Sequence, residues 1–85
     1  MPLYIIERNF LEELDADGID RDEVRLVNED EDVQWVFSFL SADKKKTYCL
    51  YEAPNPEAIR AAAARLGIPA DVIVEVSPDR VMPTL

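Results

Sequence analysis

The stretch that most constrains this chain is VQWVFSFLSADKKKTYCLYEA, residues 33–53. Two β-rich runs, 33–41 and 46–53, lie on either side of a short link that contains two lysines. The link is too short to carry a crossover, so the two runs must pair as antiparallel neighbours. The chain is therefore expected to contain at least one β-hairpin with a fixed order of strands.

Neither strand of this hairpin alternates as a strand with one wet face should. In the first strand, Trp35, Phe37 and Phe39 are expected on one face, while Val36 and Leu40 occupy the other. The second strand is apolar on both faces in the same way. Both faces of the sheet that contains this hairpin therefore need a cover.

The other elements follow from local signals. Asp20 is a helix cap for a helix from Arg21 to about Asp30, although the extent of helix within 9–32 is open. Asn55, followed by Pro56, starts a second helix that Gly67 ends. The remaining β-rich runs are 3–8 and 72–76.

The resulting order is strand, helix, strand, strand, helix, strand. This order predicts an α+β fold of the ferredoxin-like βαββαβ type, with a four-stranded antiparallel sheet and two helices on one face. Right-handed crossovers place the first and third strands in the centre. We expect one domain over residues 1–85, with an acidic variable segment at 11–31 and a C-terminal tail at 77–85.

Two helices can cover only one face of such a sheet. Large apolar side chains on the second face would form a patch that monomers rarely expose. A second copy packed sheet against sheet is the simplest cover, so we expect a homodimer. The alternative is that the acidic segment 9–20 folds across the sheet.

Charge and composition exclude several classes of protein. The net charge is −9, and twelve of the 18 acidic residues lie between Glu7 and Asp32, which argues against binding to nucleic acid. No apolar run is long enough to span a membrane, and the N-terminus lacks the pattern of a secretion signal. With a single cysteine, Cys49, the chain fits a reducing compartment, and we expect it in the cytoplasm.

Few residues could carry chemistry. There is no histidine, which removes the commonest general base and metal ligand, and residues 13–24 match a calcium loop only in part. No catalytic residue can be named. The groups on the strands that could line a ligand site are Glu7, Trp35, Phe37, Ser38, Phe39 and Tyr51. A weak metal site could draw on Glu7, Cys49 and Glu75.

Three patterns carry a resemblance to a known family. They are E-R-x-F from Glu7, then W-x-x-S-F with T-x-C-x-Y-x-A-P in the hairpin, and PEAIRAAAARLGIPAD after it. Together they resemble a bacterial domain-of-unknown-function family of small ferredoxin-like proteins that includes an actinobacterial nickel-binding protein. The resemblance implies a cytoplasmic homodimer and possible nickel binding. Relatives commonly place a histidine and a tyrosine where this chain has Phe37 and Phe39. Imidazole is a favoured nickel ligand, so we expect at most weak nickel binding here.

Two functions of different classes remain. The first is a small dimeric protein, not an enzyme, that binds a small ligand or weakly a divalent metal. The alternative is a cofactor-free enzyme of the dimeric α+β barrel type, similar to a monooxygenase or an isomerase. The scarcity of polar groups on the strands favours the first.

Overall fold

The structure, a computed structural model, describes residues 1–77, except for the side chain of Ala16. The expected C-terminal tail at 77–85 lies outside the described residues apart from Ser77. The chain forms, in order, β1 (Leu3–Asn9), a 3-10 turn η1 (Ala16–Gly18), α1 (Arg21–Asp30), β2 (Gln34–Leu40), β3 (Lys46–Glu52), α2 (Pro56–Leu66) and β4 (Val72–Val76). The described part of the chain contains no helix long and apolar enough to cross a membrane.

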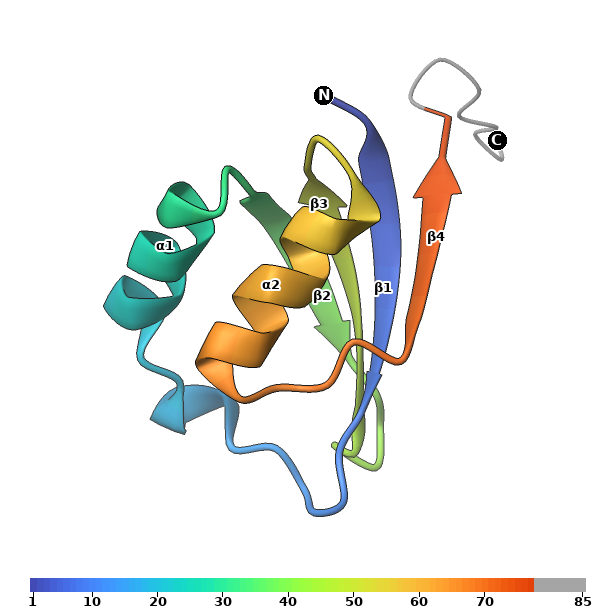
Figure 1. Cartoon of the computed structure of the whole chain (residues 1–85). Coiled ribbons are helices and arrows are strands. Elements are labelled where there is room, and N and C mark those ends of the chain that lie inside the picture. Colours follow the sequence, from blue (N-terminus) through green and yellow to red (C-terminus); the bar gives the residue numbers. More distant parts are fainter. Residues whose placement is uncertain (78–85) are drawn as a thin grey trace.

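The four strands form one antiparallel sheet in the order β2-β3-β1-β4. Both helices lie on the same side of this sheet (Figure 1). The ferredoxin-like fold is therefore confirmed, with β1 and β3 in the centre as the crossover rule requires. The side of the sheet that carries the helices is called the helix side below, and the other side is called the open face.

The helices begin and end where their capping residues are. The Asp20 carboxylate accepts a hydrogen bond of 3.1 Å from the Glu23 N–H at the start of α1, and the Asn55 side chain accepts one of 2.9 Å from the Ala58 N–H at the start of α2. Gly67 ends α2 in the left-handed conformation, with φ 68°. Each cap satisfies a backbone group that the end of a helix leaves without a partner.

The end of α1 is acidic, which is the unfavourable sign for a helix C-terminus. Arg65 of α2 compensates this negative charge. Its guanidinium lies 3.2 Å from the Asp30 carboxylate and 3.1 Å from that of Glu31. All three side chains are partly exposed, so each pair contributes modestly, about 0–1 kcal/mol. Arg65 nevertheless ties the two helices together at this end.

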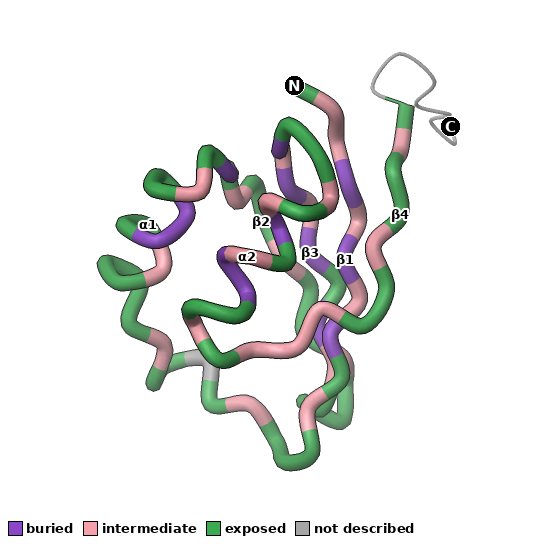
Figure 2. Tube along the Cα trace, viewed as in Figure 1, coloured by how far each residue is buried: buried purple, intermediate pink, exposed green. Residues whose placement is uncertain are grey.

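The core lies between the sheet and the helices (Figure 2). It consists of inward-facing residues of the central strands and the inner side of α2, namely Tyr4, Ile6, Val33, Cys49, Tyr51, Ala53 and Ile59. Period-two alternation places these strand residues on the helix side, and their neighbours Ile5 and Leu50 therefore lie on the open face.

A β-bulge corrects the expectation for the second strand. The pairing of β2 with β3 shifts between Trp35 and Phe37, so Val36 is an extra residue in the ladder. Trp35 is opposite Tyr51 on the helix side, whereas Phe37 is opposite Leu50 on the open face. The prediction that Trp35, Phe37 and Phe39 share one face is wrong, because a bulge changes the phase of the alternation.

The acidic segment between β1 and α1 does not cover the open face. The Phe10 N–H donates to the Lys45 carbonyl at 2.8 Å, and the Leu14 N–H donates to the Lys44 carbonyl at 2.7 Å. The segment thus follows the end of the hairpin and then turns to the helix side, where α1 begins (Figure 1). Within residues 1–77, nothing lies across the open face.

Candidate functional site

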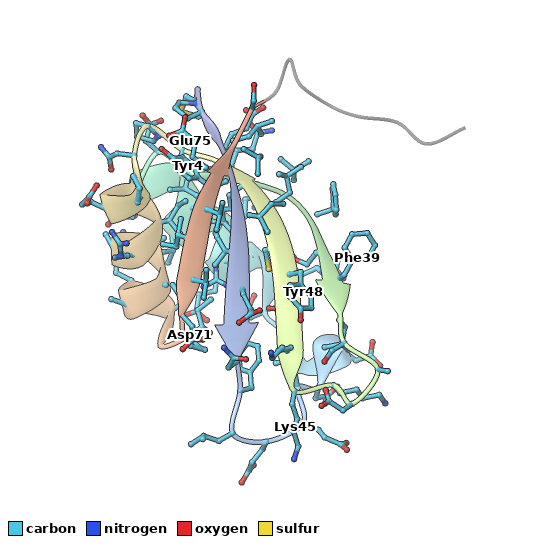
Figure 3. All side chains as sticks on the ribbon, turned by 90° about the vertical axis from the view of Figure 1, so that its right-hand side faces the viewer. Tyr4, Phe39, Lys45, Tyr48, Asp71 and Glu75 are labelled. Atoms are coloured by element: carbon cyan, nitrogen blue, oxygen red, sulfur yellow. The ribbon has the colours of Figure 1, made fainter. Side chains whose placement is uncertain are left out.

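The open face is the larger of two candidate surfaces. It carries apolar side chains from all four strands, including two aromatic rings on β2, at its edge: Phe37, 46% exposed, and Phe39, 66% exposed. The two ring centroids are 5.4 Å apart in an edge-to-face arrangement. Figure 3, which looks toward the sheet from the side away from the helices, shows Phe39 and Tyr48 from neighbouring strands.

Glu7 is the acidic group in the middle of this face. Its cross-strand neighbours are Tyr48 on β3 and Val72 on β4. One carboxylate oxygen lies 3.9 Å from the Lys46 ammonium, and the other accepts a hydrogen bond of 3.3 Å from the Asn9 side-chain amide. Glu7 is thus a paired carboxylate on a largely apolar face, which also carries Glu52 opposite Leu3.

The second candidate is a pocket of about 650 Å³ on the helix side. Its floor is formed by Arg8 of β1 and by Thr47, Cys49 and Tyr51 of β3. Its walls are the inner side of α1, the segment before α1, the bulged edge of β2 and the end of α2. Most of these wall residues are apolar; the polar ones are Ser38 of β2 and, at the start of α1, Asp20, Arg21 and Glu23.

Arg8 and Tyr51 form the most unusual pair on this floor. Arg8 is only 4% exposed, and its guanidinium carbon lies 5.6 Å from the centre of the Tyr51 ring. One of its amino groups donates a hydrogen bond of 2.6 Å to the Pro69 carbonyl. Burial raises the pKa of the Tyr51 hydroxyl above its usual range, and the positive charge of Arg8 offsets this only in part. Tyr51 therefore remains a neutral hydrogen-bond donor at neutral pH.

The other polar groups of the pocket are held by their neighbours. The Trp35 ring N–H donates to the Ser38 hydroxyl oxygen at 2.8 Å, an interaction that the bulge permits because it turns both side chains to the helix side. The Cys49 thiol lies 3.6 Å from the Thr47 hydroxyl and is buried. None of these groups is paired with a general base, so the arrangement suits binding more than nucleophilic catalysis.

The structure divides the residues that the sequence suggested for a ligand site. Trp35, Ser38 and Tyr51 line the pocket, and the bulge brings part of Phe37 to its edge. Glu7 and Phe39 lie on the opposite side of the sheet and do not reach it. A single site built from all six residues is therefore ruled out within one copy of the chain.

Arg8 is the pocket residue that sequence reasoning missed. A signal for it exists in the alternation of β1, because Arg8 shares its face with Tyr4 and Ile6 and must therefore point inward. The sequence draws attention to Glu7 instead, whose side chain lies on the other face. A charged residue in phase with a core stripe was the informative observation.

The residues suggested for a metal do not come together. Glu7 lies on the open face, Cys49 on the helix side of β3, and Glu75 on β4 opposite Tyr4. No group of three or more potential ligands occurs anywhere in the described residues 1–77. With no histidine in the sequence, the donor atoms of one chain do not fit a nickel ion.

Comparison with known proteins agrees with this fold. A family model described as "Nickel responsive protein SCO4226-like" matches residues 4–76. The chain is also similar to the crystal structure of SCO4226 from Streptomyces coelicolor A3(2), with 25% identity and a TM-score of 0.75 over 87% of this chain and 94% of that one. No curated protein matches. Since the family model spans nearly all of the described residues, the chain belongs to the SCO4226-like family of nickel-responsive proteins.

Proposed function

We propose that this chain is a binding protein, not an enzyme, and that it holds a small, largely apolar molecule in the helix-side pocket. The observation that carries the proposal is the composition of that pocket, with apolar walls around a floor of a few convergent polar groups. Small-molecule sites usually have this character. The pocket also contains three of the residues that the sequence suggested for a ligand, Trp35, Ser38 and Tyr51.

The chemistry of the floor favours binding over catalysis. A tyrosine whose pKa is raised holds its proton at neutral pH and is a poor general base. The sequence has no histidine that could activate Cys49 or Thr47. The groups on the floor can donate hydrogen bonds and orient a ligand, which is what a binding protein requires.

We also propose that two copies pair through the open face. The support is the exposure of large apolar side chains on β2, β3 and β4, together with an acidic segment that lies on the helix side and leaves this face uncovered. A stable interface covers about 800 Å² on each partner, and the face of a four-stranded sheet is of that order. The acidic groups around α1 would lie outside such an interface, which limits the repulsion between two copies of charge −9.

For nickel we propose only weak binding by this chain, since its donor atoms are dispersed over both sides of the sheet. We expect the protein in the cytoplasm, a reducing compartment that suits its free and buried Cys49.

A neutral fluorescent probe tests the pocket. N-phenyl-1-naphthylamine brightens in apolar sites, and we expect the wild type to bind it. Val24→Trp fills the pocket from the inner side of α1 and should abolish this signal. Leu26→Trp is the matched control, because Leu26 is on the same helix but is 57% exposed and outside the pocket. Equal fluorescence from wild type and Val24→Trp would count against the pocket.

A further inference from the structure

Arg8 is a buried charge without an acidic partner. The chain has 18 acidic residues, and three exposed arginines pair with them, Arg25, Arg60 and Arg65. No such ion pair reaches Arg8 within residues 1–77, although it is the most buried arginine there. Buried charges are normally paired with an opposite charge or a metal. The missing negative charge is the feature to be explained.

The contacts that Arg8 makes are a hydrogen bond to the Pro69 carbonyl, a side-chain hydrogen bond with Tyr51 and a contact with the Tyr51 ring, and they use only part of its donors. A guanidinium has five N–H groups, and the Pro69 carbonyl accepts from one of its nitrogens at 2.6 Å. The ring of Tyr51 faces the charge at 5.6 Å, which offers a weak cation–π attraction. Neither partner is negatively charged. Because Arg8 belongs to the floor of the pocket, its remaining N–H groups are available to a molecule in that pocket.

The surroundings define the anion that would fit. The Tyr51 hydroxyl keeps its proton and lies beside Arg8, so a planar oxyanion could accept hydrogen bonds from both. The walls beyond them are apolar, with Val24, Leu66 and Ile68 among them. Asp20 and Glu23 lie at the start of α1, at the rim of the pocket, together with Arg21. These carboxylates disfavour a second negative charge on the ligand.

We infer that the pocket takes a small organic monocarboxylate, with its carboxylate on the Arg8 guanidinium and its apolar body against α1 and the end of α2. This inference rests on the proposed binding function and specifies its ligand class. It gives Arg8 the negative partner that the chain itself does not supply. A bidentate pairing of a guanidinium with a carboxylate also matches the planar geometry of both groups.

The test compares two molecules of the same shape, 2-naphthoate and its neutral amide, 2-naphthamide, in which an NH2 group replaces the charged oxygen. Titration calorimetry should show naphthoate binding to the wild type roughly 10–100 times more tightly, as expected for hydrogen bonds to a charged group. Arg8→Gln should remove this preference. Two matched controls that each remove one positive charge, Lys46→Gln on the open face and Arg60→Gln on the outer side of α2, should keep it.

Each other outcome is decisive. Equal affinity of the two molecules for the wild type would overturn the anion site while leaving an apolar pocket intact. Loss of the preference in Lys46→Gln but not in Arg8→Gln would place the ligand on the open face and overturn the assignment. If neither molecule binds, the inference fails, and the naphthylamine experiment decides separately whether the pocket binds anything. If Arg8→Gln does not fold, NMR of the wild type replaces it, and the Arg8 side-chain N–H signal should shift with naphthoate only.

Discussion

At the scale of single residues, Tyr51 shows how the fold sets the chemistry of one group. The Tyr51 side chain is on the floor of the pocket, is only 4% exposed, and its aromatic ring faces Arg8. Burial disfavours the charged phenolate, and the guanidinium recovers only part of that loss. Tyr4, on the same side of the sheet, is affected in the same direction by burial and by the carboxylates of Glu75 and Glu57.

Two raised tyrosine pKa values predict how stability depends on pH. The folded state holds these protons more tightly than the unfolded state, in which tyrosine has a pKa of about 10. The stabilisation is therefore complete below about pH 10 and is lost as the pH rises further. Urea unfolding between pH 8 and 11.5 should show this decline, and Tyr51→Phe should make it shallower. A free energy of unfolding that rises above pH 10 would contradict the raised pKa.

The residues suggested as metal ligands do not come together on the sheet, and this leads to a prediction for nickel binding. Because Glu7, Cys49 and Glu75 do not converge, titration calorimetry with nickel should give a dissociation constant well above about 1 μM, which corresponds to less than about 8 kcal/mol of binding free energy. Glu7→Gln should leave this weak binding nearly unchanged. Submicromolar binding by the wild type would show that donors from two chains, or from residues beyond 77, build a site together.

At the scale of secondary-structure elements, α2 is the best-defined unit. Its start is set by Asn55 and Pro56, its inner side by Ile59, Ala62 and Ala63, and its end by Gly67. All of these signals are local, which explains why the sequence predicts this helix almost to the residue. The only non-local contribution to this helix is the sheet, against which its inner side chains are buried.

The C-cap of α2 can be tested by substitution. A Cβ at Gly67 would meet no atom within 4 Å, so Gly67→Ala creates no clash. The cost comes only from the left-handed backbone and should be about 1–2 kcal/mol. Ala64→Gly, at an exposed position one turn earlier, is the control and should cost about 1 kcal/mol through helix propensity. Gly67→Asn should lose less than Gly67→Ala, and chemical denaturation can rank all three; the reverse order would argue against the cap.

The sequence could predict most of the fold and only part of the site, for physical reasons. Caps, turns and period-two or helical spacing act over a few residues, so they are visible in the sequence of β1, α1, α2 and β4. The bulge in β2 is different, because it depends on pairing with β3, and it separates Trp35 from Phe37 and Phe39. The pocket likewise depends on where α1 and the segment before it come to lie. No local pattern contains that information.

At the scale of the whole molecule, the two sides of the sheet differ in kind. The helix side holds the core, the pocket and the acidic segment, whereas the open face is largely apolar and carries the Glu7–Lys46 ion pair and Glu52. The proposed dimer would bury the open face and leave the two pockets outside, one in each copy. Ligand binding and pairing would thus use opposite sides of one sheet.

The proposed pairing predicts the mass of the protein in solution. Sedimentation at micromolar concentration should report about twice the chain mass of 9.7 kDa. Phe39→Glu places a charge at the β2 edge of the proposed interface, on a side chain that is 66% exposed, and should weaken association at least tenfold, a change of about 1.4 kcal/mol. Leu26→Glu adds the same charge on α1 and should leave the mass unchanged. A folded wild type that sediments as a monomer would refute the dimer.

The bulge in β2 also determines how this strand would respond to losing a residue. Val36 occupies a place in the chain but no step of the ladder, so its deletion leaves Trp35 opposite Tyr51 and Phe37 opposite Leu50. Deletion of Ser38 lets Val36 take a step of the ladder instead, which moves Phe37 from opposite Leu50 to opposite Cys49 on the helix side and leaves Trp35 opposite Tyr51. Emission from Trp35, the one tryptophan, should therefore keep its wild-type wavelength without Val36, whereas deletion of Ser38 removes the hydrogen-bond partner of its ring N–H and should shift the emission. Red-shifted emission from the chain without Val36 would show that Val36 is needed to keep Trp35 on the helix side. β2 is thus one residue longer than its pairing requires, and the chain could be shortened there with the register of the strand kept and only the Val36 side chain lost from the pocket wall.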